Sequence, residues 1–202
     1  NQVDLKNQSI SSDSFRASAE LSIGLPSASP RPAQGELKVS YRLSLDRTND
    51  HLAVETSEFH IRLIDGSRPR PIIRYEFERH ARNKPGAHLH IHSDSVPLAI
   101  SLDRNGQRSS ASDQSKLHYP TGGHRYRVCL EDVIQLAIVE LSFRGKDKWE
   151  EHVENGRSQF RSKQAETVIR QNHDLAAQTL RNLGYEVTLE TNLDIPSASP
   201  SW

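Results

Sequence analysis

Five of the ten histidines in this sequence lie in two short segments, and imidazole side chains are suited to acid–base chemistry or metal binding. In the first segment His88, His90 and His92 alternate with Leu89 and Ile91. A β-strand with this alternation carries the three imidazoles on one face, about 6.5–7 Å apart. We therefore expect the three histidines on one face of the strand, with Leu89 and Ile91 turned toward the core.

Two imidazoles at this spacing can share a metal ion, and a third ligand from elsewhere in the chain would leave zinc one open position. The candidates for that third ligand are His118, Glu76, Glu78 and Asp94. The alternative is an amphipathic strand that carries histidine on its solvated side. Because the sequence lacks the H-E-x-x-H and Cys-rich spacings of established metal sites, we expect no metal ligands and no cofactor. Folding is predicted not to require a metal ion.

The second segment, residues 116–127, joins a glycine pair to basic side chains. The glycines allow backbone amides to turn inward and the start of a helix follows, so an anion such as phosphate can be held there. The alternative is a glycine turn whose arginines pair with nearby carboxylates. The spacing matches neither the Walker nor the dinucleotide fingerprint, so ATP and NAD are not indicated. The residues expected to bind an anionic substrate are Lys116, Arg125 and Arg127.

The first histidine segment belongs to a series in which apolar and polar residues alternate, as is typical of half-buried strands. The clearest examples are residues 37–45, 59–63 and 73–77. Residues 96–102 are expected to add a further strand. No helical segment separates these strands, so they predict an antiparallel sheet from about residue 36 to residue 102. The polar residues 103–116 are expected to form a mobile loop.

Apolar residues recur at helical spacing in the second half of the chain. Residues 130–143 form the helix that we expect to pack on the sheet, with Glu131 and Asp132 at its positively polarised start. A longer helical segment covers residues 156–183, with a break near Asn172. The sequence therefore predicts an α+β fold, an antiparallel sheet packed by a helix and followed by a C-terminal helical extension. The expected parts are a flexible or loosely attached N-terminal segment at 1–35, an α+β domain at 36–143, a helical extension packed on it at 144–190, and a tail at 191–202.

The composition excludes several classes of protein. Lys and Arg together number 26, as do Asp and Glu, so the formal net charge is zero. That balance argues against a protein that coats nucleic acid, although a nucleic acid can still be a substrate. No apolar run approaches the roughly 18 residues that a membrane helix needs, so we expect no membrane partner. The single cysteine, Cys129, is expected to be a buried and inert thiol, and its isolation indicates a cytoplasmic protein.

Several phrases of the sequence carry a family resemblance. They are Arg74-Tyr75-Glu76, His88-x-His90-x-His92, Leu117-His118-Tyr119-Pro120-x-Gly122-Gly123-x-Arg125-Tyr126-Arg127-x-x-Leu130-Glu131-Asp132 and Leu183-Gly184-Tyr185-Glu186-Val187. Over roughly residues 36–190 the chain resembles a family of uncharacterised actinobacterial proteins, which implies one continuous cytoplasmic protein and assigns no reaction. It is more loosely similar to compact toxins of prokaryotic toxin–antitoxin pairs, in which an Arg-Tyr-Asp-like strand precedes a His-rich strand. Glu76 replaces that Asp here.

The histidine and arginine residues together suggest chemistry at phosphorus. Imidazole has a pKa near 6.5, so it can both take and give a proton at neutral pH. A guanidinium group from Arg125 or Arg127 would stabilise the charge that gathers on phosphorus. The sequence thus predicts an RNA- or nucleotide-directed phosphodiesterase, such as a toxin or a defence component. Its expected catalytic residues are His88 or His92 as general base and His118 or His124 as general acid.

A non-catalytic protein is the alternative interpretation. The neutral charge and the long C-terminal helices favour a binding partner, such as an antitoxin or a regulator, that docks another protein. The clustered histidines and arginines favour the enzyme. Close approach of His88 or His92 to His118 or Arg125 around an open cleft would favour the enzyme, and their separation would favour the binding protein.

Overall fold

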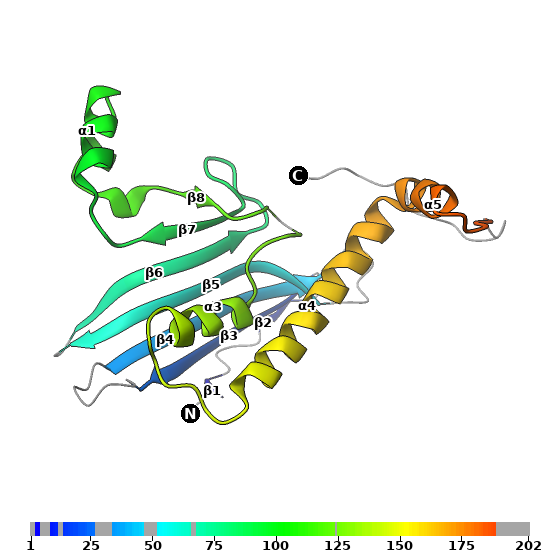
Figure 1. The fold of residues 1–202 in the computed structure, drawn as a ribbon, viewed down its shortest axis with the longest axis horizontal. Coiled ribbons are helices and arrows are strands. Elements are labelled where there is room, and N and C mark those ends of the chain that lie inside the picture. The colour runs from blue at the N-terminus through cyan, green and yellow to red at the C-terminus, as the bar shows by residue number, and fades with distance from the viewer. Residues whose placement is uncertain are drawn as a thin grey trace.

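The chain folds into one antiparallel sheet with helices, as a computed structural model shows (Figure 1). It describes residues 3–4, 9–11, 14–26, 34–46, 52–65, 68–123 and 125–188. These residues form an eight-stranded sheet in the order β1, β3, β4, β5, β6, β7, β8, with β2 also paired to β3. The α+β fold expected from the sequence is therefore confirmed.

Strands occupy most of the N-terminal half, and helices occupy most of the C-terminal half. The strands are β1 (Val3–Asp4), β2 (Ser9–Ser11), β3 (Ser14–Leu25), β4 (Gln34–Leu45), β5 (Leu52–Asp65), β6 (Arg68–Glu78), β7 (Ala87–Ile91) and β8 (Tyr119–Pro120). The helices are α1 (Val96–Arg104), α2 (Arg108–Ser112), the short 3₁₀ helix η1 (Gln114–Lys116), α3 (Leu130–Val139), α4 (Trp149–Gln171) and α5 (His173–Asn182).

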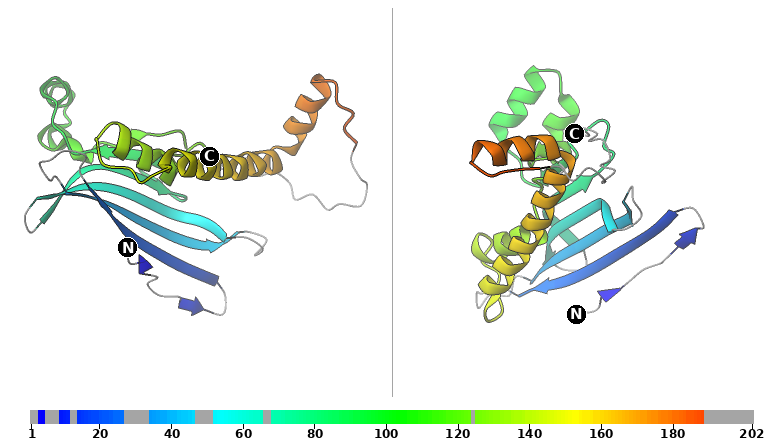
Figure 2. Two further views of the ribbon diagram at one scale, coloured as in Figure 1. Left: turned by 60° about the horizontal axis from the view of Figure 1, so that its bottom comes forward. Right: turned by 90° about the vertical axis from the view of Figure 1, so that its right-hand side faces the viewer.

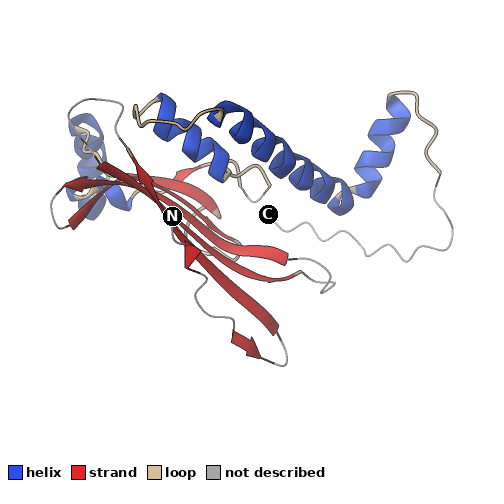
Figure 3. Cartoon of the chain, turned by 90° about the horizontal axis from the view of Figure 1, so that it is seen from below, coloured by secondary structure: helices blue, strands red, loops and turns tan. Residues whose placement is uncertain are grey.

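Alternation along the central strands gives the sheet one apolar and one polar face. On the apolar face Leu37 and Val39 of β4 pair with Ile61 and Phe59 of β5, and all four side chains are buried. Because successive residues of a strand point to opposite faces, the charged and polar residues between them lie on the other side. Helices α3 and α4 lie on the apolar side of the sheet, as Figure 3 shows from below.

Helix α3 closes the core against the apolar face. Its fully buried Val133 packs with the strand residues, together with Phe143 from the segment that follows the helix. The Asp132 carboxylate accepts a hydrogen bond of 3.2 Å from the backbone N–H of Cys129 and so caps the helix start. The helix ends at Val139 and is therefore shorter than the expected 130–143. Phe143 still packs in the core, although it lies outside the helix.

Helix α4 is joined to α3 and then extends past the sheet. Arg157 of α4 donates from Nε to Asp132 of α3 at 2.8 Å, and Val153 is buried. The helix is continuous from Trp149 to its end before Asn172, so the expected break there is confirmed. After it, α5 projects away from the sheet (Figure 2). None of the helices in the described part of the chain combines the length and the apolar character needed to cross a membrane.

The N-terminal region departs from the expectation of a loosely attached segment at 1–35. Its residues 14–25 form β3, which pairs antiparallel with β4 along the sheet. Leu21 and Ile23 of this strand pack against the core. Burial of these two apolar side chains favours pairing of β3 with β4. The polar residues around them led to the prediction of a loosely attached segment.

The segment between β7 and β8 also differs from expectation. Residues 96–102, expected to form a strand, lie in α1, and the polar residues 103–116 continue through α1 into α2 and η1. Pro97 fits the first turn of a helix, where its missing N–H breaks no hydrogen bond. The outer edge of β7 is instead paired with β8. Residues 185–188 have no regular secondary structure.

Candidate functional site

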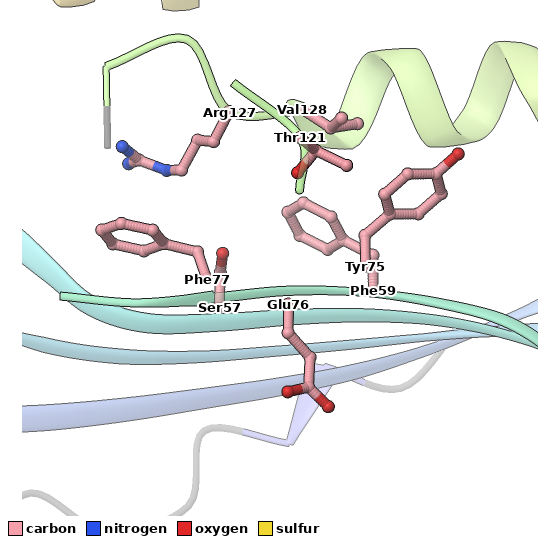
Figure 4. Close-up of a pocket in the computed structure, with 8 residues that line it drawn as sticks. All are labelled: Ser57, Phe59, Tyr75, Glu76, Phe77, Thr121, Arg127 and Val128. Carbon is pink, nitrogen blue, oxygen red and sulfur yellow. The ribbon is translucent and has the colours of Figure 1, made fainter. Parts of the chain in front are cut away.

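The register between β6 and β7 assembles a group of titratable side chains on the polar face of the sheet. Glu76 pairs with His88, and Arg74 pairs with His90. Figure 4 shows the Glu76 side chain pointing away from that of Phe77, its neighbour in β6, to the opposite side of the sheet. The sequence alternation therefore predicted correctly that these histidines share one face.

His88 and His90 are buried, in contrast to the alternative interpretation of a strand that carries histidine on its solvated side. His88 has 0% and His90 has 4% of its surface exposed, whereas Ile91, expected in the core, is 39% exposed. The reason is that other segments of the chain cover the rings. The carbonyl of Pro85, before β7, contacts His88, and the carbonyl of Ser115, in η1, contacts His90. Local alternation carries no information about this cover.

These carbonyl contacts fix the direction of both rings. The Nδ1 atoms of His88 and His90 lie 2.8 and 2.7 Å from the carbonyl oxygens of Pro85 and Ser115. A carbonyl only accepts, so Nδ1 of each ring carries the proton and donates. In the neutral ring this leaves Nε2 with its lone pair. The Nε2 atoms of His88 and His90 lie 3.1 and 3.8 Å from the two carboxylate oxygens of Glu76, so both point to the same place.

His118 completes a triangle of imidazoles. Its ring centroid lies 4.8 Å from that of His88 and 4.8 Å from that of His90, and the latter two are 5.1 Å apart. One ring nitrogen from each of the three lies within 4.8 Å of the others. His118 is exposed, unlike its two neighbours, so the triangle has one side open to solvent.

The surroundings of His90 and His118 favour the imidazole form that can bind a metal. Burial lowers the pKa of His90 against the opposing effect of the Ser115 carbonyl, and the positive charge of Arg74 lowers it further. Burial and then the neighbouring His88 lower the pKa of His118. A lowered imidazole pKa favours the neutral ring, which is the form that coordinates metal ions.

Glu76 is held as a carboxylate beside the three rings. Burial alone would raise its pKa, but the charges of Arg74 and Lys84 and a hydrogen bond from Lys84 act against burial, and the pKa falls below its ordinary value. Arg74 Nε lies 2.5 Å from one carboxylate oxygen, and Lys84 Nζ lies 3.3 Å from the other. The group therefore offers an ionised oxygen ligand next to the ring nitrogens.

The structure places the other expected site residues in different surroundings. His92 lies beyond the triangle and stacks on His60 of β5, with ring centroids 6.2 Å apart. Lys116 is exposed and contacts Ser109 Oγ at 3.1 Å and Asp113 at 3.6 Å. His124, expected as a possible general acid, lies outside the described residues.

The two arginines expected to bind phosphate lie on the helix side of the sheet, away from the histidines. The guanidinium of Arg127 stands 4.2 Å above the ring of Phe77, and Figure 4 shows it across the sheet from Glu76. Arg125 Nε donates to Gln171 of α4 at 3.2 Å. The expectation that these arginines act beside the histidines is therefore wrong, because the chain after β8 crosses over the apolar face before α3 begins.

Cys129 has no features of a catalytic nucleophile. It is buried, as expected, and burial raises the pKa of its thiol to about 12. The thiol lies 3.2 Å from the Asp132 carboxylate at the start of α3. The neutral thiol is a poor nucleophile, so its role is to pack and to support the helix cap.

Sequence analysis missed the groups that aim the rings. The Pro85 and Ser115 carbonyls have no signal in the sequence, because every residue has a backbone carbonyl. Arg74 was not singled out either, although its position two residues before Glu76 in a strand places both on one face. His118 and Glu76 were among the candidates for a third metal ligand, and the structure brings both to His88 and His90.

No family model matches this chain, and no curated protein or solved structure matches it. The resemblance to uncharacterised actinobacterial proteins therefore stays a prediction. The function has to be argued from the geometry of the histidine triangle and its surroundings.

Proposed function

We propose that this protein binds a divalent transition-metal ion, zinc being the best fit, through His88, His90 and His118. One observation carries the proposal: Nδ1 of both buried rings donates to a backbone carbonyl, and this directs the two Nε2 atoms to one place. Histidines that ligate metals almost always donate their second ring N–H in this way. The proposal replaces the expectation of no metal, which rested on missing sequence motifs. Here strand register would assemble the ligands.

The ligand types support zinc. Three imidazoles are a common zinc ligand set, and the ion then keeps a fourth position for water or for another ligand. The Glu76 carboxylate faces the same place and is a candidate for that position. Alternatively the exposed side, next to His118, can admit water, whose pKa a bound zinc ion lowers toward neutrality.

Binding requires only a small movement of the rings. Nitrogens bound to tetrahedral zinc at about 2.1 Å are roughly 3.4 Å from one another. The ligand nitrogens of the triangle lie within 4.8 Å of one another, so they have to approach by up to about 1.4 Å. His118 is exposed and has the freedom to make this adjustment, while the carbonyl contacts hold His88 and His90 in place.

A structural network is the competing explanation of the same contacts. If His88 is protonated at both nitrogens, it can donate to Pro85 and to Glu76 at once, as an ion pair of 3.1 Å. In that case the triangle would only close this end of the sheet. Such a network gives no reason for tight metal binding, so metal affinity separates the two explanations.

The test is metal titration of full-length protein produced without a histidine tag and stripped with a chelator. Isothermal titration with zinc, and the visible absorption of cobalt as a substitute, should both show one ion bound per chain. His118→Ala should weaken binding about 100-fold or more, since even the outer partners of metal ligands contribute 10–100-fold. His152→Ala, which changes an exposed histidine on α4, is the matched control and should bind normally. Absence of binding, or equal loss in both variants, would contradict the proposal.

Two features of the site support hydrolysis of phosphodiesters as its reaction. His88 and His118 meet the proximity that the sequence-based hypothesis required, although Arg125 does not. A metal ion here would supply the activated water and the charge stabilisation that those arginines were expected to provide. Zinc-loaded protein should hydrolyse bis(p-nitrophenyl) phosphate, and His118→Ala should not. The geometry does not bear on a toxin or defence role.

Docking of another protein through the C-terminal helices is the second candidate function. The observation that favours it is the exposure of three large apolar side chains on and just after α5, namely Leu175, Leu180 and Leu183. Light scattering on the full chain tests the simplest occupant, a second copy of the protein. If the protein is a dimer and the double variant Leu175→Ser, Leu180→Ser is a monomer, docking through these side chains is supported. If the parent protein is a monomer at high concentration, the result argues against self-association.

A further inference from the structure

Among the residues that the structure describes, four buried side-chain nitrogens without hydrogen-bond partners lie on the polar face, beside the histidine triangle. They are His60 Nε2, Arg62 Nε, Arg74 Nε and His92 Nε2. Arg74 Nε is close to Glu76, but at an angle that makes no hydrogen bond. Buried polar atoms in proteins are nearly always hydrogen-bonded, so four unpartnered atoms in one area call for a common explanation.

Three neighbouring strands bring these four side chains together. His60 of β5 pairs with Arg74 of β6, and its ring stacks on that of His92, just after β7, at 23° between the ring planes. Arg62 follows His60 by two residues on β5 and so projects from the same face. Helices α3 and α4 lie on the other side of the sheet and do not cover this area (Figure 3).

The local charge favours an anion over a cation. Burial is the largest cause that lowers the pKa of His60 to about 4, and the nearby positive charges of Arg74, Arg62 and Lys38 act in the same direction. A second metal ion is therefore disfavoured here. Both Arg62 Nε and Arg74 Nε are N–H donors, and guanidinium donors are well suited to phosphate oxygens.

The carboxylates of the area engage other atoms of the same side chains. Glu36 accepts from Arg62 Nη2 at 2.6 Å, and Glu58 lies 3.7 Å from His60 Nδ1. Lys38 pairs with Glu20 at 2.5 Å. These contacts orient the cationic side chains, and Arg74 Nε is held in its ion pair with Glu76. The charge of Asp113 also acts on His92. His60 Nε2, Arg62 Nε and His92 Nε2 are left without a hydrogen-bond partner, so an acceptor for these three atoms is still needed.

We propose that His60, Arg62, Arg74 and His92 bind a phosphate group next to the metal centre. Arg74 connects the two sites, because it also pairs with Glu76, whose carboxylate faces His88. The role of this group as part of a substrate rests on the proposed metal centre, but binding of the phosphate itself does not need the metal. In this proposal Arg62 and Arg74 bind phosphate, the role that the sequence analysis assigned to Arg125 and Arg127.

Titration of metal-free protein, in the presence of a chelator, with inorganic phosphate and with dimethyl phosphate tests the proposal. Saturable binding of either supports it, and the relative affinities distinguish a free phosphate from a diester. Arg62→Gln should weaken binding about 10-fold or more, as should His92→Asn if the first variant fails to fold. Arg42→Gln, an exposed arginine on β4, is the matched control and should bind normally. No saturable binding, or equal binding by Arg62→Gln and the parent protein, would overturn the proposal.

Zinc affinity, measured on the same variants, separates this proposal from the metal centre. Arg62→Gln should bind zinc as tightly as the parent protein, and His118→Ala should still bind phosphate without metal. Loss of phosphate binding alone, or of zinc binding alone, therefore identifies which of the two sites is affected.

Discussion

The two faces of the sheet both contain fully buried side chains, but burial has a different consequence on each. On the apolar face Leu37, Ile61 and Val133 are buried by packing alone, and this burial stabilises the fold. On the polar face His88 is equally buried, and hydrogen bonds hold its ring in one direction. Fixing polar atoms in this way contributes little net stability and prepares them for a ligand. The comparison separates the face that holds the chain together from the face that can do chemistry.

The largest expected effect comes from placing a charge on the apolar face. Val133→Asp should destabilise the protein by about 3–5 kcal/mol, because the carboxylate would be buried without a partner. That is a large share of the roughly 5–15 kcal/mol by which an ordinary domain is stable. Val133 has 0% of its surface exposed, whereas Val139, at the end of the same helix, has 54%.

Val139→Asp is therefore the control. It should cost at most about 1 kcal/mol, from the unfavourable position of a carboxylate at a helix C-terminus. Circular dichroism during thermal unfolding measures both variants. Similar melting temperatures for the two would show that α3 does not pack on the sheet as described.

The polar face should make stability depend on pH through His60. Burial and the charges of Arg74 and Arg62 lower the pKa of His60 from 6.5 to about 4 in the folded chain. The unfolded chain therefore takes up a proton near pH 6.5, and the folded chain does not until about pH 4. Stability contributed by neutral His60 is present above pH 6.5 and is lost as pH falls toward 4, by about 3 kcal/mol in total.

Urea unfolding of the metal-free protein at pH 7 and pH 4.5 measures this loss. In His60→Gln the loss should be smaller by most of that amount, since the variant has no imidazole to protonate. His152→Gln, on the surface of α4, should behave like the parent protein. An equally steep loss in His60→Gln would mean that His60 is not held neutral by its surroundings.

A smaller effect is expected where α4 is attached to the apolar side. Arg157 donates to Asp132 at 2.8 Å and to Glu154 at 2.9 Å, and its side chain is mostly buried. Arg157→Ala should lower the free energy of unfolding by about 1–2 kcal/mol, because hydrogen bonds between charged groups are stronger than neutral ones. The loss is limited because Arg161 also lies near Asp132 and can replace part of the contact. Arg161→Ala, an exposed change, should cost less than about 0.5 kcal/mol. If Arg157→Ala and Arg161→Ala lower the melting temperature equally, Arg157 does not attach α4 to α3 as described.

The smallest expected effect is that of His118→Ala on the metal-free protein. His118 is exposed and belongs to the face that does not carry the core, so its removal should change stability by less than about 0.5 kcal/mol. Thermal unfolding in a chelator measures this. A large loss would place the histidine triangle among the structures that hold the fold, and would favour the structural network over the metal site.

The sequence predicted the two faces because alternation is a local property. Leu37 and Phe59 could be assigned to the core, and His88 and His90 to the other face, from their spacing alone. The helical spacing around Val133 likewise predicted the helix that covers the apolar face. The fold class follows from these elements, and the structure confirms it.

Burial and partnership depend on segments that are distant in sequence, and here prediction from the sequence failed. Nothing near His88 indicated that other segments would cover the ring, so its burial was not predicted. No local sequence pattern indicates which face of the sheet the chain crosses after β8. Arg127 was therefore assigned to the wrong side of the sheet. The site could be named in part, through His88 and His118, but its orientation by backbone carbonyls could not.

X-ray absorption at the zinc edge, on protein loaded with one zinc ion per chain, tests the central claim most directly. The account predicts about three imidazole nitrogens at roughly 2.0–2.1 Å from zinc, and one imidazole fewer in His118→Ala. His152→Ala should give the spectrum of the parent protein. A zinc environment without imidazole scattering, or an identical spectrum from His118→Ala, would show that the ion is not held by His88, His90 and His118.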